Sequence, residues 1–175
     1  MSSDIQENNI PKFHLARFEE FPNIDLYLDQ VFTFLEKNLA DFVPSDEDKL
    51  ITKTMINNYV KQGVLPPPIK KKYNNEHIAY LFVICILKQV YSISDISQLI
   101  NLAIKTTSPK EAYNSFCAEL ENAIFLTYSN SDNLTVNSSF SASSQVDLSK
   151  EHYLLKNVVQ SYANKLYVEK NFLHK

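Results

Sequence analysis

The chain has 175 residues, 45% of them hydrophobic, and a formal net charge of −3 at pH 7. This length and apolar content suit one compact domain with appendages. Because Gly63 is the only glycine, phosphate loops of the Walker or dinucleotide type are excluded. The N-terminus is polar, and the longest apolar run, 78–87, is about half the length that crosses a bilayer. We therefore expect a soluble, cytoplasmic protein without a membrane span.

Helical periodicity extends along almost the whole chain and predicts an all-α fold. Residues 1–22 are expected to form an irregular N-terminal arm. A helical stripe of apolar residues follows over 24–39, and an acidic, proline-containing connection over 41–48. A short helix then begins at Thr52 or Lys53.

That short helix ends at Gly63, a residue suited to the left-handed conformation that closes helices. Pro66, Pro67 and Pro68 are expected to hold the chain extended through the three lysines at 70–72. A long helix capped by Asn74 or Asn75 should reach about Val90. Another helix should follow, from residue 92 or 94 to about 105.

Ser108, Pro109 and Glu111 form a strong helix start, with a capping hydroxyl, a proline in the first turn and a reciprocal carboxylate. This helix is expected to reach about Tyr128. A Ser- and Asn-rich stretch over 129–148 predicts a mobile loop, and a final helix has an apolar side over 155–167. The predicted organisation is an arm at 1–22, a head at 23–107 and C-terminal helices at 108–175.

The segment 49–75 differs in charge from the rest of the chain. It contains six lysines and no acidic residue, whereas the remainder has eleven basic against twenty acidic residues. Because association with a polyanion follows the local electric field, this concentration of positive charge predicts a surface that faces a polyanion.

The segment contains the run INNYVKQGVL from Ile56 to Leu65, followed by Lys71-Lys72-Tyr73. This order resembles the DNA-binding head of MerR-type regulators, with the first run in place of the family's reading helix and the second where the family's basic wing ends. Asn75, Glu76, Ile78, Leu81 and Ile84 keep the register of the next helix, and 91–96 matches the last element. Over residues 10–130 the chain also resembles an uncharacterised bacterial family that shares this helix-turn-helix head.

The resemblance implies a sequence-dependent, DNA-binding transcriptional regulator whose partner is double-stranded DNA. Its wing is shortened to PPPIKKKY and lacks the family's glycine hairpin, while Asn57 stands in place of an arginine. On a helix over 53–62, the residues expected to face the groove are Lys53, Thr54, Asn57, Asn58 and Lys61. In the wing, Lys70, Lys71, Lys72 and Tyr73 are the expected contacts, with the lysines touching phosphates.

Other interpretations remain open at this stage. The helix face and the lysine run can be solvated surface only, or the chain can be a non-enzymatic protein-interaction module that keeps the fold. The apolar stripe at 155–167, together with Ala112, Phe116, Leu120, Ala123 and Ile124, can form a homodimer seam or pack back on the head as core. Some of the many Tyr and Phe residues can line an effector pocket between the head and the last helices.

No constellation for catalysis or metal binding is visible. The four histidines are scattered, and Cys85 and Cys117 lie singly in helical patterns. His77 falls in the first turn of a predicted helix, where the resemblance makes it structural, and Cys85 has the neighbours of a core residue. We therefore expect neither enzymatic activity nor a metal or other cofactor.

Overall fold

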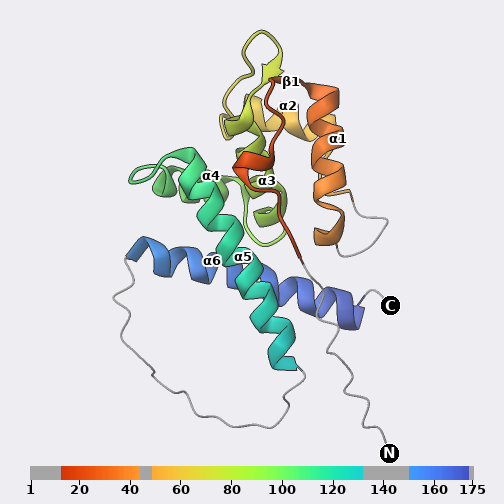
Figure 1. The fold of residues 1–175 in the computed structure, drawn as a ribbon, viewed down its shortest axis with the longest axis vertical. Helices are drawn as coiled ribbons and strands as arrows, with labels where there is room; N and C mark the ends of the chain where they lie inside the picture. Colours follow the sequence, from red (N-terminus) through yellow and green to blue (C-terminus); the bar gives the residue numbers. More distant parts are fainter. Residues whose placement is uncertain (1–12, 44–48, 132–149, 174–175) are drawn as a thin grey trace, which may run out of the picture.

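The computed structural model describes residues 13–43, 49–131 and 150–173, and it is mainly helical with one small sheet (Figure 1). The helical elements, in chain order, are η1 (Phe18–Glu20), α1 (Leu28–Asn38), η2 (Ala40–Phe42), α2 (Lys53–Lys61), α3 (Asn75–Leu87), α4 (Ile93–Ala103), α5 (Pro109–Ser131), α6 (Lys150–Val168) and the π-helical turn η3 (Glu169–Leu173). The strands are β1 (Leu26–Tyr27) and β2 (Lys72–Tyr73). The all-α prediction therefore holds at the level of fold class.

The small sheet joins two segments that are far apart in the sequence. Strand β1 pairs with β2 in antiparallel fashion, with Leu26 opposite Tyr73 and Tyr27 opposite Lys72. Leu26 and Tyr73 are buried beneath the sheet. The sheet thereby fixes the start of α1 beside the start of α3.

Helix α3 lies at the centre of the core and is apolar on nearly every side, as expected of a fully buried helix. Phe82, which is fully buried, stacks on Phe21 at 5.6 Å between ring centroids and contacts the rings of Phe34 and Tyr113 at 6.0 and 6.1 Å. One core cluster includes residues from Leu15 to Leu166. All three predicted parts of the chain therefore contribute to a single core.

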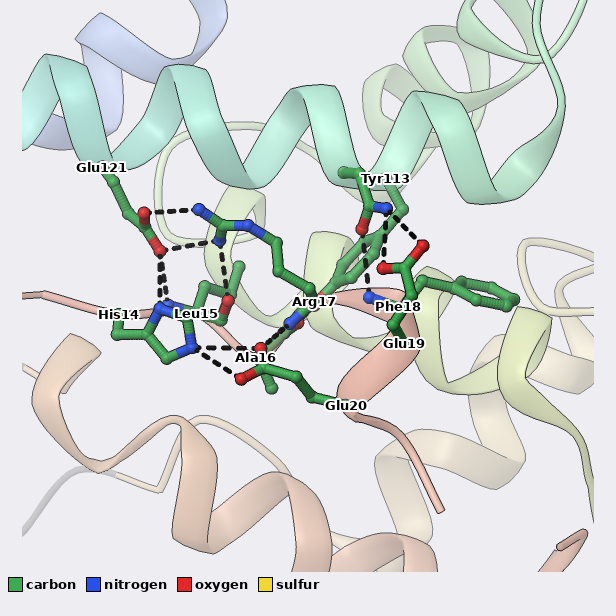
Figure 2. Close-up of polar contacts among 10 residues, drawn as sticks. His14, Leu15, Ala16, Arg17, Phe18, Glu19, Glu20, Tyr113 and Glu121 are labelled. Atoms are coloured by element: carbon green, nitrogen blue, oxygen red, sulfur yellow. Dashed lines mark hydrogen bonds and ion pairs between the residues drawn. The ribbon is translucent and has the colours of Figure 1, made fainter. Parts of the chain in front are cut away.

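The described end of the N-terminal arm lies along α5 (Figure 2). Arg17 forms a bidentate ion pair with Glu121, with N–O distances of 2.7 and 2.6 Å, and the Leu15 amide donates a hydrogen bond to the same carboxylate at 2.8 Å. The Tyr113 hydroxyl donates to the Ala16 carbonyl at 2.7 Å. Although this segment is mostly without regular secondary structure, as expected, its backbone is held at several points.

Glu19 extends these contacts toward the start of α5. Lys110 lies 2.8 Å from its carboxylate, and the Asn114 amide donates to it at 3.0 Å. These hydrogen bonds, with that from Lys110 the strongest, lower the pKa of Glu19 from 4.5 to about 2. The carboxylate therefore loses its proton more readily in the folded chain than in the unfolded chain.

A folded-state pKa below the unfolded value stabilises the fold above the unfolded pKa and ceases to do so as the pH falls through the folded pKa. We expect the Glu19→Gln variant to be less stable than the parent protein at pH 6. The difference should shrink below pH 4.5 and vanish near pH 2. Urea unfolding at a series of pH values measures this difference in stability. A difference that stays constant from pH 6 to pH 2 would show that the pKa of Glu19 is not lowered in the folded chain.

Several boundaries differ from those predicted. The first helix begins at Leu28, not near Ile24, because β1 pairs with β2 in between. Helix α3 ends at Leu87, not at Val90 as expected, and the Val90 and Tyr91 amides both donate hydrogen bonds to the Leu87 carbonyl. Helix α5 continues to Ser131, so the first residues of the predicted loop at 129–148 are helical. The rest of that loop, from residue 132, lies outside the described residues.

The residues nominated for a dimer seam are instead mostly core within one chain. Val158, Val159, Tyr162, Ala163 and Leu166 of α6 are buried, as are Phe116, Leu120, Ala123 and Ile124 of α5. The Tyr162 hydroxyl donates to the Phe42 carbonyl at 2.9 Å, which ties α6 to η2. Their apolar surface is thus covered by the chain itself, which was the alternative interpretation.

Among the described residues, no helix combines the length and the apolar character that crossing a bilayer requires.

Candidate nucleic-acid interface

Helix α2 forms over the residues that the sequence predicts. The Thr52 hydroxyl caps it by accepting from the Met55 amide at 3.2 Å. At the other end Gly63 has φ +71°, the left-handed conformation, and the Val64 and Leu65 amides donate back to the Tyr59 carbonyl. Ile56 and Tyr59 face the core. Burial raises the pKa of Tyr59 to about 12, so its hydroxyl stays protonated.

The opposite face of α2 is exposed. It consists of Lys53, Thr54, Asn57, Asn58 and Lys61, the full set expected to face a groove. Lys53 forms an ion pair with Asp29 of α1, and its ammonium lies 5.9 Å from the centre of the Phe32 ring. Within the described part of the chain, the side chains of the other four make no hydrogen bond or ion pair. They are therefore free to meet a partner.

The lysines after the prolines lie in a tight turn, and the expectation of an extended chain there is wrong. Ile69 and Lys72 exchange backbone hydrogen bonds of 3.0 and 2.9 Å, and the two residues between them, Lys70 and Lys71, have φ of 49° and 65°. Positive φ at both central positions is typical of a type I′ hairpin turn. Each such non-glycine residue costs roughly 1–2 kcal/mol of conformational energy. The glycine hairpin that the sequence lacks is thus replaced by a hairpin of lysines.

The side chains around this lysine turn are divided between two faces. Because directly opposed residues share a face of a sheet, Tyr27, Lys72 and Ile69 lie on the same side. Tyr27 and Ile69 are 54% and 65% exposed, and the Lys72 ammonium lies 5.1 Å from the centre of the Tyr27 ring. Tyr73, which was expected to contact DNA, points the other way and is 3% exposed. It is a core residue, and we remove it from the site.

The lysine turn and α2 belong to the same end of the molecule. Lys72 contacts Tyr27, and Asp29, two residues further on, pairs with Lys53, the first residue of α2. Figure 1 shows the turn at the top of the molecule, with α2 just below it and α5 and α6 at the other end. Five lysines and three neutral polar side chains of α2 thus lie at one end of the molecule, and we call this set the lysine-turn surface: Lys53, Thr54, Asn57, Asn58, Lys61, Lys70, Lys71 and Lys72.

Two residues of this surface were not expected from the sequence. Tyr27 and Ile69 join it only because β1 pairs with β2, and a two-residue strand has no recognisable alternation. A hairpin signal was equally absent, since neither Lys70 nor Lys71 is a usual turn residue.

The remaining candidates for chemistry lie in structural positions. His77 is buried at the start of α3, where its ring bonds the Pro67 carbonyl at 3.2 Å and helps hold the proline segment. Cys85 and Cys117 are buried, and burial raises the pKa of each thiol to about 12. In the three described ranges, no group of three or more His, Cys, Asp and Glu residues is placed to hold a metal ion.

Residues 16–116 match the family described as "Domain of unknown function (DUF1836)", a match that spans more than half of the chain. The chain belongs to the DUF1836 family. The DUF1836 match begins beside Arg17, includes the whole lysine-turn surface and ends within α5. It confirms that the relatives of this chain form an uncharacterised family. No curated protein and no solved structure matches the chain.

Proposed function

We propose that this DUF1836 protein is a sequence-dependent DNA-binding regulator of transcription. Helix α2 enters the major groove, and the lysine turn contacts the phosphate backbone beside it. The observation that carries the proposal is the placement of the exposed polar face of α2, four of whose five side chains have no polar partner among the described residues, at the same end of the molecule as the lysine turn. The resemblance of this segment to MerR-type heads agrees with that arrangement.

The chemistry of the lysine-turn surface fits a duplex. An Asn side chain can bond an adenine edge with both of its amide atoms, and Asn57 and Asn58 have no competing partner in the described chain. Lysines neutralise phosphates, each contact contributing about 0.9 to the slope of log affinity against log salt. Tyr27 and Ile69 add apolar surface between the lysines, which suits contact with sugars.

The one arginine of the chain takes no part in this interface. Arg17 is held by Glu121 on α5, and this ion pair raises its pKa further. Because arginine is the commonest reader of guanine, we expect recognition to favour adenine-containing sites through asparagine.

The second candidate is a module that binds an acidic protein. The observation that favours it is the ion pair between Lys53 and Asp29, since a carboxylate already occupies the first position of the α2 face. The two candidates require the same surface but differ in the partner.

Titration with duplex DNA at 50 and 200 mM salt distinguishes the DNA-binding proposal from the acidic-partner candidate. In the variant Lys70→Asn with Lys71→Gly, two charges are lost while the turn receives residues that accept positive φ, so the fold should be kept. We expect its affinity for DNA to fall about tenfold or more at low salt, and its salt slope to fall by about two.

The matched control carries Lys105→Gln with Lys150→Gln, two exposed lysines outside the lysine-turn surface. It should bind DNA as the parent protein does. If the parent protein fails to bind DNA at low salt, or if both double variants lose affinity equally, the proposal is wrong and the acidic-partner candidate takes its place.

Asn57→Ala tests sequence reading. We expect it to weaken binding to adenine-containing sites by about 1–3 kcal/mol while leaving binding to other duplexes nearly unchanged, because an amide contact to a base is lost but no phosphate contact is. A competition series with a selected site and scrambled duplexes measures this. An equal loss for every duplex would show that Asn57 does not read bases.

A further inference from the structure

A cavity of about 480 Å³ opens between helices α3 and α4 on one side and α5 and α6 on the other. In Figure 1 this junction lies on the left, where α4 stands above the N-terminal end of α6. The volume is within the range of pockets that take small organic ligands, roughly 300–1,000 Å³. Its wall is mainly apolar, and all four helices contribute to it through Tyr80, Val83, Leu99, Phe116, Leu155 and Val158.

The charged side chains of the cavity wall are acidic, apart from one histidine. Glu76 lies in the first turn of α3 and Glu151 in the first turn of α6, positions where a helix favours negative charge. Neither forms an ion pair with the described residues. The histidine of the wall, His152, lies 3.4 Å from the Glu119 carboxylate. The cavity therefore joins a large apolar surface to two carboxylates that have no ion-pair partner among the described residues.

The field of Glu76 reaches the wall of the cavity. Burial raises the pKa of the Tyr80 hydroxyl, and the negative charge of Glu76 raises it further. The Tyr80 ring is one of the aromatic surfaces in the cavity, and a ring face attracts a cation that carries little water.

We propose that this cavity binds a small apolar organic cation, such as an arylalkylammonium compound. The apolar body lies among Val83, Phe116 and Leu155, and the ammonium group lies beside Glu76 and Glu151. Because both carboxylates are exposed, a neutral ligand would gain no electrostatic attraction from them, and an anionic ligand would be repelled by them. The cavity shares no lining residue with the lysine-turn surface, and the proposal does not depend on whether the protein binds DNA.

Three probes of nearly the same shape test the proposal by isothermal titration calorimetry at pH 7: 1-naphthylmethylamine as the cation, 1-naphthylmethanol as the neutral compound and 1-naphthoate as the anion. We expect the cation to bind at micromolar concentration and the anion at least about tenfold more weakly. The variant Glu76→Gln with Glu151→Gln should lose about tenfold in affinity for the cation and keep its affinity for the neutral probe.

A second pair of variants locates the binding site. Ala112→Phe on α5 fills the cavity and should abolish binding of all three probes, whereas Ala118→Phe, on an exposed position of the same helix, should not. Thermal unfolding of each variant checks that the fold is kept.

Equal affinities for the three probes, or a cation affinity that survives the double Gln change, would overturn the proposal. So would cation binding that Ala112→Phe leaves intact, since the ligand would then lie elsewhere. If the parent protein sediments as a dimer that Ala112→Phe disperses, the cavity is an interface between two copies and the proposal is wrong. The proposal is also wrong if none of the three probes binds at millimolar concentration.

Discussion

Replacing Phe82 by Ala is expected to lower the free energy of unfolding by about 3–5 kcal/mol, near the upper end of that range. Phe82 is fully buried, and its ring contacts three other rings that come from the N-terminal arm, α1 and α5. Removing it leaves a cavity where these segments meet, and the neighbouring rings can fill that space only by leaving their rotamers. Chemical denaturation measures the loss.

Phe125 provides the matched control, because it is a phenylalanine of α5 that is 53% exposed. Phe125→Ala should change the stability by less than about 1 kcal/mol. Phe82→Leu, which keeps part of the volume, should fall between the two. A loss below about 1 kcal/mol for Phe82→Ala would mean that the arm does not meet the core in this way.

The second large effect is expected at Arg17. Arg17→Ala should destabilise the protein by about 2–3 kcal/mol, because it removes both guanidinium hydrogen bonds from the largely buried Glu121 carboxylate and leaves only the Leu15 amide and His14 beside it. For a chain of this size, that corresponds to a decrease in Tm of roughly 4–12 °C.

Arg17→Lys retains the charge but cannot form the two parallel bonds, so it should recover only part of the loss. A double-mutant cycle with Glu121→Gln isolates the pair. If Arg17→Ala costs as much in the Glu121→Gln background as in the parent protein, the two residues are not coupled and the arm is held by its other contacts.

The local signals in the sequence predicted most of the helices. Ser108, Pro109 and Glu111 start α5 as expected, with the Ser108 hydroxyl accepting from the Glu111 amide at 3.2 Å, and Gly63 closes α2. Such caps depend on side chains within three residues of one another, which a single sequence displays.

The sequence did not predict features that depend on residues far apart along the chain. The hairpin at Lys70 and Lys71 has no turn residue to announce it, and it is accompanied by the pairing of β2 with β1, which begins some forty-five residues earlier. That pairing also decides that Tyr73 faces the core and Tyr27 the solvent. On the candidate surface, helical periodicity was sufficient for the five residues of α2, but it could not assign faces to the residues around the turn.

The ion pair between Arg17 and Glu121 crosses the boundary of the family match, which ends at residue 116. Leu120, Ala123 and Ile124, together with the buried side of α6, lie beyond that boundary and complete the same core. A recombinant fragment cut to the matched residues would expose this apolar surface and leave Arg17 without its partner. The unit that is recognised by sequence is therefore smaller than the unit that folds, and a recombinant form of this protein should extend at least through α6.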